Sequence, residues 1–297
     1  MEKSTALRLV RLPLGLLILA VAVALTGCGD DDKKTETSGK EAKFEAGTTM
    51  AALNTAQKIT IGTKFDQPLF GLKGLSGEPE GFDVEIAKII VDELGIPTGN
   101  ITWIETPSAV REEKIQQGAV DLVAATYTIN AARKERVTFA GPYYVAGQDL
   151  MVKKENTTIT GPDSLKAAKV KVCSVSGSTP AERVKPYIDA SQLVLFDVYS
   201  KCADALRNDG VGVVTTDNVI LLGLIDKSEG AYKLVGKPFT QEPYGLGIKK
   251  GDVKFCEFID ATLQKAVSDG RYQAAWEKTA GKVAGAVPAM PAHDPCV

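Results

Sequence analysis

The sequence has little of what metal sites, nucleic-acid binding and membrane spanning require. Its 297 residues include one histidine, His293, and no two cysteines have CxxC spacing. A metal site is therefore not expected. The 35 Lys and Arg nearly balance the 37 Asp and Glu, at a net charge of −2, which argues against a nucleic-acid partner. The apolar run at residues 12–25 contains Pro13 and Gly15 and is too short to span a membrane comfortably.

That apolar run is typical of an export signal, because basic residues precede it and small residues follow it. At its end, Leu25-Thr26-Gly27-Cys28 resembles the lipobox of bacterial lipoproteins. The resemblance implies cleavage before Cys28 and a lipid on that cysteine; the alternative is a buried cysteine that ends a signal anchor. A polar stretch without apolar periodicity follows. We expect a signal peptide at residues 1–27 and a solvated tether at residues 28–57.

The other four cysteines are even in number, which in an exported chain suggests two disulfides. Three pairings are possible, and four free buried thiols are the alternative. We favour Cys173–Cys202 and Cys256–Cys296, because each pair lies within one part of the chain.

Strand-like and helix-like segments alternate from residue 58 onward, which indicates βαβ units and a mostly parallel sheet covered by helices. Residues 63–70 resemble a loop, and residues 137–144 are expected to turn the chain. Asp83 is a candidate N-cap for a helix that ends near Leu94. Strands are expected at residues 58–62, 101–104, 121–125, 148–153, 169–175, 192–197, 211–215 and 244–249, and helices at 110–117, 201–208, 253–269 and 271–279.

The alternation occurs twice, and the strands at residues 148–153 and 244–249 both end in lysine after an apolar core. This pattern suggests a second α/β lobe inserted into the first, with these two crossing strands as the hinge. We expect the first lobe at residues 58–149, the second at 150–243, and completion of the first with a C-terminal tail at 244–297. Ligands of open α/β sheets bind beyond the carboxyl ends of the strands.

The segment AATYTINAARKER, residues 124–136, suits the capture of a carboxylate. Thr126 and Thr128 follow a predicted strand and Arg133 begins a helix. Hydroxyl groups and backbone N–H groups can bind one oxygen while the planar guanidinium binds both. The alternative is a polar loop followed by a charged helix face.

Three motifs resemble the extracellular solute-binding proteins of polar amino-acid ABC transporters, in order along the chain. They are GFDVEIAKII at 81–90, GAVDLVAATYTINAARKER at 118–136 and FAGPYY at 139–144. Within this family, known as solute-binding protein family 3, the chain resembles the glutamate-binding lipoproteins through IGTKFDQP, ATYTI and FAGPYYVAGQDL. The resemblance covers residues 58 to 280 and implies the type II periplasmic-binding-protein fold, with two α/β lobes joined by a two-strand hinge.

The resemblance also implies roles for the residues that would hold the part common to all amino acids. Arg133 and Thr128 match positions that bind the α-carboxylate, and Thr126 matches one that contacts the α-amino group. In the second lobe the turn SGST at 176–179 matches a donor to the same carboxylate, through Ser178 and Thr179, and Asp217 matches the acceptor of the α-ammonium. A buried zwitterion loses hydration, so each of its charges needs a fixed partner.

Two cations are candidates for choosing the ligand side chain. Lys64 lies where a related glutamine binder has an acidic residue, and Arg111 matches an arginine that binds side-chain carboxylates in acidic amino-acid binders. The alternatives are a solvated loop lysine and an ion pair between Arg111 and Glu112. Where many members stack an aromatic ring on the ligand this chain has Ser108, and the ring would come from one of three others: Phe65, Phe70 or Tyr127.

These features predict a lipid-anchored binding protein on the outer face of the cell membrane. The protein would be a monomer and would need no cofactor. It would bind an acidic amino acid, glutamate in preference to aspartate, and deliver it to an ABC permease. Alternatives are a binder of glutamine or another polar amino acid, a sensor ectodomain, and an enzyme such as a dehydratase or lytic transglycosylase. An enzyme would need an acid or base aimed at its substrate, and Asp217 is the one candidate.

Overall fold

The computed structural model describes residues 43–75 and 77–297, and these residues form one compact unit. The expected signal peptide and the lipid-bearing Cys28 lie outside the described residues. Within the described part of the chain, no helix has the length and apolar character needed to cross a membrane.

The first sheet is mixed, with three parallel strands on one side. Its strands are β1 Ile59–Thr63, β5 Ile101–Glu105, β6 Leu122–Val123, β7 Thr138–Ala146 and β13 Glu242–Ile248. They lie in the order β5-β1-β6-β13-β7. β1 runs parallel to both β5 and β6, with Ile61 opposite Trp103 and Leu122. The carboxyl ends of these three strands therefore meet at one edge of the sheet.

The second sheet repeats this arrangement. Its strands are β8 Gln148–Lys153, β9 Val172–Val175, β10 Leu193–Phe196, β11 Val213–Asp217 and β12 Tyr232–Leu234. They lie in the order β10-β9-β11-β8-β12. β9 is parallel to β10 and β11, whereas β8 is antiparallel to β11 and β12. The short strand β12 was not predicted.

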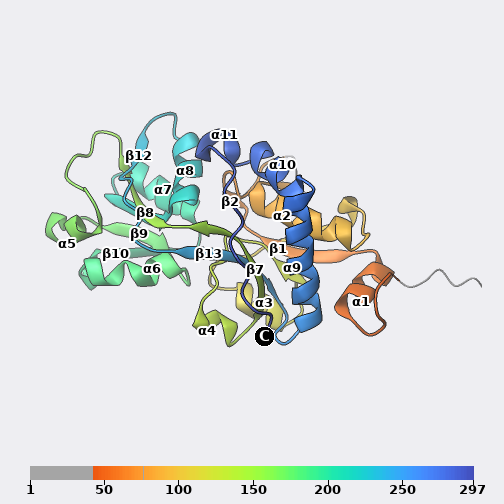
Figure 1. Ribbon diagram of the computed structural model, residues 1–297. Coiled ribbons are helices and arrows are strands. Elements are labelled where there is room, and N and C mark those ends of the chain that lie inside the picture. The colour runs from red at the N-terminus through yellow and green to blue at the C-terminus, as the bar shows by residue number, and fades with distance from the viewer. Residues whose placement is uncertain (1–42, 76) are drawn as a thin grey trace, which may run out of the picture. The chain divides into compact units, whose positions relative to one another are not determined.

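The chain passes from the first sheet to the second at Gly147 and returns through residues 235–241. The strands on the first-sheet side of both crossings pair with each other: β7 is antiparallel to β13 (Figure 1). We had expected residues 148–153 and 244–249 to be the two crossing strands of the hinge and residues 137–144 to be a turn. Instead, β7 continues through the cis Gly141–Pro142 bond, and its register with β13 shifts between Tyr244 and Leu246. This irregularity accommodates a proline that cannot donate to the ladder.

Helices cover the sheets. Their bounds are α1 Thr49–Ala56, α2 Phe82–Glu93, α3 Arg111–Gln116, α4 Ala131–Lys134, α5 Leu165–Ala168, α6 Thr179–Arg183, α7 Tyr199–Arg207, α8 Asn218–Asp226, α9 Val253–Ser268, α10 Arg271–Lys278 and α11 Gly281–Ala284. Short 3-10 helices lie at Thr98–Asn100, Pro162–Ser164, Lys185–Tyr187 and Ala190–Gln192. α2, α9 and α10 pack together on the first sheet, whereas α6, α7 and α8 pack on the second.

Two elements occupy stretches that we expected to be irregular. The first is α1, which lies within the predicted tether. The Thr48 hydroxyl accepts from the backbone N–H of Ala51, and Met50 and Leu53 are buried against the main core. An N-cap with two apolar residues three apart explains this helix. The folded chain therefore extends before residue 58.

The second is a three-stranded sheet of β2 Asp66–Gln67, β3 Gly71–Lys73 and β4 Pro79–Glu80, in the order β2-β3-β4. Its first strand lies in the stretch at residues 63–70 that we had expected to be a loop, and the other two follow it. Strands of two or three residues are too short to produce a recognisable alternation.

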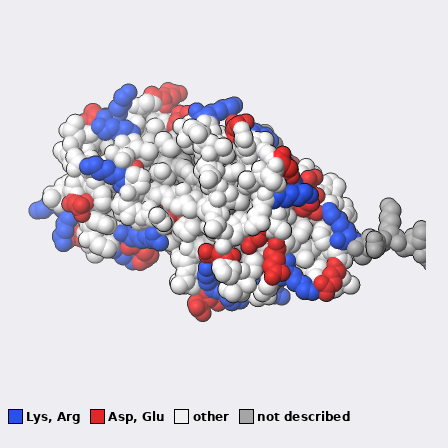
Figure 2. Space-filling view, viewed as in Figure 1, with Lys and Arg blue, Asp and Glu red and all other residues white. Residues whose placement is uncertain are grey.

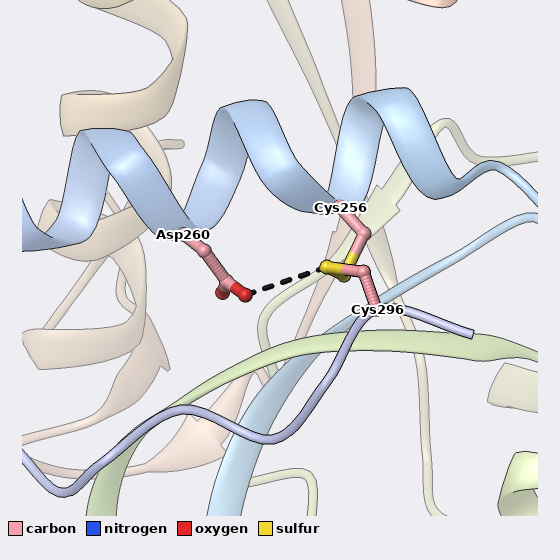
Figure 3. Close-up of side chains that lie close together, drawn as sticks. All are labelled: Cys256, Asp260 and Cys296. Atoms are coloured by element: carbon pink, nitrogen blue, oxygen red, sulfur yellow. Dashed lines mark hydrogen bonds between the residues drawn. A yellow bond between two sulfur atoms is a disulfide. The ribbon is translucent and has the colours of Figure 1, made fainter.

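Both favoured cysteine pairs are joined by disulfides. Cys173–Cys202 links β9 to α7, with Cα atoms 5.6 Å apart, and Cys256–Cys296 links α9 to the C-terminal tail, with Cα atoms 5.8 Å apart. Asp260 lies beside the second disulfide, with Oδ2 3.4 Å from Cys296 Sγ (Figure 3). Because both sulfurs are bonded to each other, this group of potential ligands is not a thiolate metal site.

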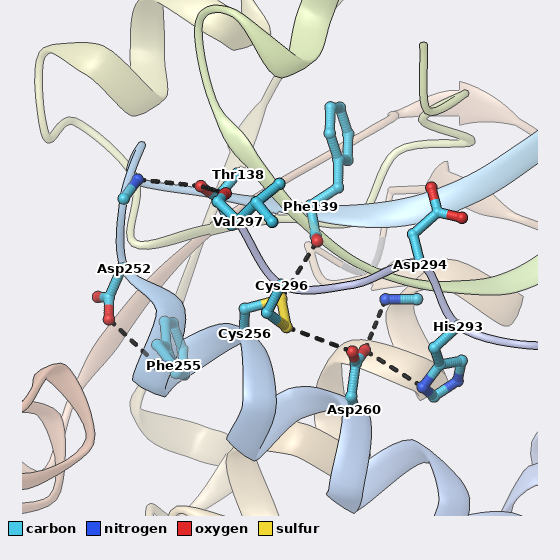
Figure 4. The surroundings of a disulfide bond; sticks show 12 residues. Thr138, Phe139, Asp252, Phe255, Cys256, Asp260, His293, Asp294, Cys296 and Val297 are labelled. Atoms are coloured by element: carbon cyan, nitrogen blue, oxygen red, sulfur yellow. Dashed lines mark hydrogen bonds and ion pairs between the residues drawn. A yellow bond between two sulfur atoms is a disulfide. The ribbon is translucent and has the colours of Figure 1, made fainter. Parts of the chain in front are cut away.

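The tail lies along β7 and is held there by more than its disulfide (Figure 4). Asp294 donates its backbone N–H to the carbonyl of Gly141, at 2.8 Å, and Gly141 donates to Asp260 Oδ1, at 2.7 Å. His293 Nδ1 lies 3.3 Å from the same oxygen of Asp260. The sole histidine thus belongs to a structural contact of the first sheet.

Candidate functional site

The eight residues proposed to bind ligand are all buried, between 1% and 9% exposed. They come from loops beyond parallel strands of both sheets, as the βαβ pattern predicted. Lys64 follows β1, Thr126 and Thr128 follow β6, Ser178 and Thr179 follow β9, and Asp217 ends β11. The remaining two, Arg111 and Arg133, begin or lie within the short helices α3 and α4.

Arg133 connects the loops of the two sheets. Asn130 caps α4 by accepting from the backbone N–H of Arg133, at 2.9 Å, which fixes where the side chain starts. Its Nη1 donates to the carbonyl of Thr128 at 2.6 Å, and its Nη2 donates across to the carbonyl of Gly177 at 3.1 Å. Nε lies 3.3 Å from Glu112 Oε1. Burial and the nearby charge of Arg111 lower the pKa of Arg133 to about 10.

Arg111 lies beside Arg133 but has no carboxylate partner within salt-bridge distance among the described residues. Its Nη1 donates to the carbonyl of Ala125 at 2.7 Å, and its guanidinium stacks 4.0 Å from the ring centroid of Tyr127. The expected alternative, an ion pair with Glu112, is not what the structure has, because Glu112 turns toward Arg133. Nε of Arg111 is buried without a hydrogen-bond partner in the described part of the protein.

Lys64 is buried rather than a solvated loop lysine, with an exposed fraction of 3%. Its Nζ donates to the hydroxyl of Ser108 at 2.9 Å. Burial is the main cause that lowers the pKa of Lys64 to about 7, and repulsion from Arg111 is the second. Ser108, at the position where the resemblance led us to look for an aromatic ring, thus accepts the hydrogen bond from Lys64.

Asp217 lies at the end of β11 with its two oxygens in different environments. Oδ2 accepts from the Tyr244 hydroxyl at 2.6 Å. Oδ1 is buried and has no hydrogen-bond partner among the residues that the structure describes. Burial and the negative charge of Glu242 raise the pKa of Asp217 to about 7. One carboxylate oxygen is therefore available for a cationic ligand group.

Thr126 has a left-handed backbone, with φ of +45°, which is uncommon for a β-branched residue. Asp83 stabilises this conformation: it accepts from the backbone N–H of Thr126 at 2.6 Å and from the Tyr143 hydroxyl at 2.5 Å. Our prediction that Asp83 caps a helix is wrong. The N-cap of α2 is Gly81, and Asp83 lies in the first turn, directed into the core. Nothing in the local sequence gave this role, because Thr126 is far away along the chain.

The turn before α6 has one hydroxyl group that caps its own helix and one that contacts the first sheet and its loops. Ser178 is the N-cap of α6 and accepts from the backbone N–H of Ala181 at 3.1 Å. Thr179 donates to Glu242 Oε2 at 2.8 Å, and its hydroxyl lies 3.3 Å from that of Thr128. Gly177 is needed at the turn, because its φ is +74° and an added Cβ would lie 2.8 Å from Ala109 Cα.

A cavity of about 420 Å³ opens at these loops. Of the predicted ligand-binding residues, Arg133, Ser178 and Thr179 line it, together with Ser108 and Glu112. Lys64, Arg111, Thr126, Thr128 and Asp217 are not among its lining residues. The cavity therefore reaches the carboxylate-binding part of the predicted site, and the two halves of the site contact each other beyond it through Arg133–Gly177 and Thr128–Thr179.

The three candidates for an aromatic wall have other environments. Phe70 is in the main core, edge-on to Phe82 and Tyr244. Tyr127 lies under the guanidiniums of Arg111 and Arg133. Phe65 faces Lys73, with Nζ 4.7 Å from the ring centroid. Cation–π packing beneath the two arginines is thus the clearest role for an aromatic ring in this region.

Two comparisons with known sequences identify the family of this chain and its relatives. The model of the bacterial extracellular solute-binding proteins, family 3, matches residues 59–282. The chain belongs to this family. It is 39% identical over 269 residues to the glutamate-binding protein GluB of Corynebacterium glutamicum, covering 88% of this chain and 86% of that protein. It is 38% identical over 266 residues to the glutamine-binding protein GlnH of Bacillus subtilis, covering 89% and 95%.

Solved structures of binding proteins share the fold of this family member. An ancestral arginine-binding protein bound to glutamine matches with a TM-score of 0.70 at 32% identity, covering 75% of this chain and 97% of the other. A solute receptor for L-cysteine from Neisseria gonorrhoeae matches with a TM-score of 0.72 at 30% identity, covering 80% and 96%. The fold is that of type II periplasmic binding proteins, and the protein is a solute-binding protein, not an enzyme.

Proposed function

We propose that this family 3 protein binds glutamate between its two sheets and delivers it to an ABC permease. The observation that carries the proposal is the pair of buried cations, Lys64 and Arg111. Neither has a salt bridge to a carboxylate within the described residues. A buried cation without a partner costs on the order of 1–3 kcal/mol or more, and a side-chain carboxylate of the ligand would remove that cost.

The remaining charges suit the α-carboxylate and α-ammonium of an amino acid. Arg133, with Thr128 and the turn at Ser178 and Thr179, would bind the α-carboxylate. Asp217 would accept from the ammonium through Oδ1, which has no hydrogen-bond partner among the described residues, and Thr126 would contact the same group. Arg133 lies beyond a strand of the first sheet and Asp217 at the end of a strand of the second. A zwitterion bound to both residues would therefore hold the two sheets together.

Glutamine is the main alternative, since GlnH is as similar to this chain as the glutamate binders are. The charges argue against it. A neutral amide offers Lys64 and Arg111 one carbonyl oxygen and leaves their charges uncompensated, whereas the carboxylate neutralises one of them and can accept from both. Aspartate carries the same charge on a shorter chain and is the second acidic candidate.

Export, lipid anchoring at Cys28 and a monomeric state complete the proposal. Export and anchoring are supported by the apolar run at residues 12–25, by the lipobox-like LTGC and by the extracellular family. On the face in Figure 2, Lys and Arg are interspersed with Asp and Glu rather than gathered in one patch. The visible charge therefore suggests no particular docking face for a permease.

A thermal-shift screen of the twenty amino acids, followed by calorimetry, tests the ligand. Because a ligand that binds only the folded state raises the apparent stability, glutamate should give the largest shift and glutamine a small one. An equal or larger shift with glutamine would refute the proposed ligand. Lipid anchoring is tested separately: mass spectrometry of the membrane-extracted protein should find a lipid on Cys28, and a soluble product that retains an unmodified Cys28 would contradict it.

A further inference from the structure

Helix α7 begins without a capping side chain of its own. Val198 occupies the N-cap position, and the first turn contains no acidic residue. The first backbone N–H groups of a helix have no partner within it. In α7, Asp66 supplies the acceptor. Its Oδ2 accepts from the N–H of Tyr199 at 2.7 Å and from the N–H of Ser200 at 3.1 Å.

This cap comes from the other half of the protein, where the first half is the first sheet with the elements packed on it and the second half is the second sheet with its helices. Asp66 lies in β2, which follows β1 of the first sheet along the chain and pairs with β3, and β3 packs on α2. In contrast, α7 packs on β9 and β11 of the second sheet. The caps of α1, α6 and α9 come instead from the residue that directly precedes each helix. The cap of α7 therefore forms only where the two halves are together.

Both ends of this contact are fixed to ligand-binding loops. Gln67, the neighbour of Asp66, accepts from the hydroxyl of Thr126 at 3.0 Å. On the other side, the Cys173–Cys202 disulfide joins α7 to β9, and β9 leads directly into the turn with Ser178. A change in the separation of the two loops would thus change the distance from Asp66 to α7.

We propose that Asp66 is a positioning residue, which holds the second half against the first by capping α7 only in the ligand-bound arrangement. When the halves separate, water solvates the N–H groups of Tyr199 and Ser200, and the stabilisation is lost. The negative charge of Asp66 also interacts favourably with the positive end of a helix. Asp66 therefore slows ligand release through hydrogen bonds to α7 and not to a residue proposed to bind ligand, although its charge also acts on the nearby Lys64.

The inference rests on the proposed function, because it requires an amino acid that binds between the halves. The test compares Asp66→Ala with Asp252→Ala, a matched control in which the lost carboxylate caps α9 from its own first-half position. Dissociation is measured by chasing radiolabelled glutamate with unlabelled glutamate. A typical N-cap contribution predicts release about five- to tenfold faster for Asp66→Ala, with the association rate little changed. Asp252→Ala should lower the melting temperature and leave release unchanged.

A second variant separates positioning from simple helix stability. The extended backbone of Val198 suits an N-cap aspartate, so Val198→Asp added to Asp66→Ala gives α7 a local cap. The double variant should recover the melting temperature and still release glutamate quickly. Unchanged release in Asp66→Ala, or slow release restored by Val198→Asp, would overturn the proposal.

The proposed ligand and this inference fail separately. If the wild-type protein does not bind glutamate, the proposed ligand is wrong. The same release comparison is then made with the amino acid that gives the largest thermal shift in the screen, and the ratio between Asp66→Ala and wild type still decides the role of Asp66.

Discussion

Arg133 Nη2 donates to the carbonyl oxygen of Gly177 at 3.1 Å, and this hydrogen bond connects a loop of the first sheet to a loop of the second. The same guanidinium contacts Glu112 and the carbonyl of Thr128. It is thus held on three sides at the mouth of a cavity of about 420 Å³. A planar group fixed in this way can bind both oxygens of a carboxylate without further ordering.

The first prediction concerns Arg133. Arg133→Ala should weaken the binding of every amino acid that binds the wild type, by about a hundredfold or more, because a buried carboxylate would lose its bidentate partner. Calorimetry measures the loss. Arg136→Ala is the control, since Arg136 also lines the cavity but is exposed and bonded to Gln116. Near-normal glutamate affinity in Arg133→Ala would contradict the α-carboxylate assignment.

The second prediction concerns selectivity. Combining Lys64→Ala with Arg111→Ala should weaken glutamate about a hundredfold more than glutamine, since two charge-assisted hydrogen bonds to the side-chain carboxylate are lost. Titration calorimetry with both ligands gives the ratio. Lys73→Ala, a nearby exposed lysine over Phe65, should change neither affinity. Equal losses of affinity for glutamate and glutamine would show that Lys64 and Arg111 do not determine which ligand side chain is preferred.

The third prediction concerns pH. Without ligand, Lys64 and Asp217 both have a pKa of about 7. A bound carboxylate raises the pKa of Lys64, so affinity falls as pH rises above about 7. A bound ammonium lowers the pKa of Asp217, so affinity falls as pH drops below about 7. Glutamate affinity should therefore be greatest near neutral pH.

Calorimetry between about pH 5.5 and about pH 8.5 measures this profile. Lys64→Met should remove the alkaline decline and keep the acidic one, and Asp217→Asn should do the reverse, at lower overall affinity in each case. A flat wild-type profile, or one unchanged in shape by both substitutions, would refute the assignment.

The fourth prediction concerns the cysteines. Non-reducing peptide mapping should recover Cys173 joined to Cys202 and Cys256 joined to Cys296. Replacing Cys173 and Cys202 by alanine should lower the free energy of unfolding by about 2–4 kcal/mol, mainly because the unfolded chain gains freedom. Denaturant unfolding measures it. A Cys173–Cys256 peptide would exclude the pairing.

The order of strands and helices could be predicted because apolar periodicity is a local property. Alternating segments after residue 58 identified two sets of parallel strands, and ligand residues were expected at their ends. Lys64, Thr128, Ser178 and Asp217 do follow or end such strands. Short elements could not be predicted, because β2, β3 and β4 have only two or three residues each. The strand β7 was missed because its Gly141-Pro142 pair is usual in turns.

Sequence alone thus determined the family, the alternation of elements and which charged residues lie near strand ends. Only the tertiary structure decided the partners of those charges. Glu112 pairs with Arg133 and not with the adjacent Arg111, Asp83 fixes Thr126 from 43 residues away, and Asp66 caps a helix 133 residues further on. The physical reason is that ion pairs and hydrogen bonds depend on distances of a few ångströms between segments that packing, not local sequence, brings together.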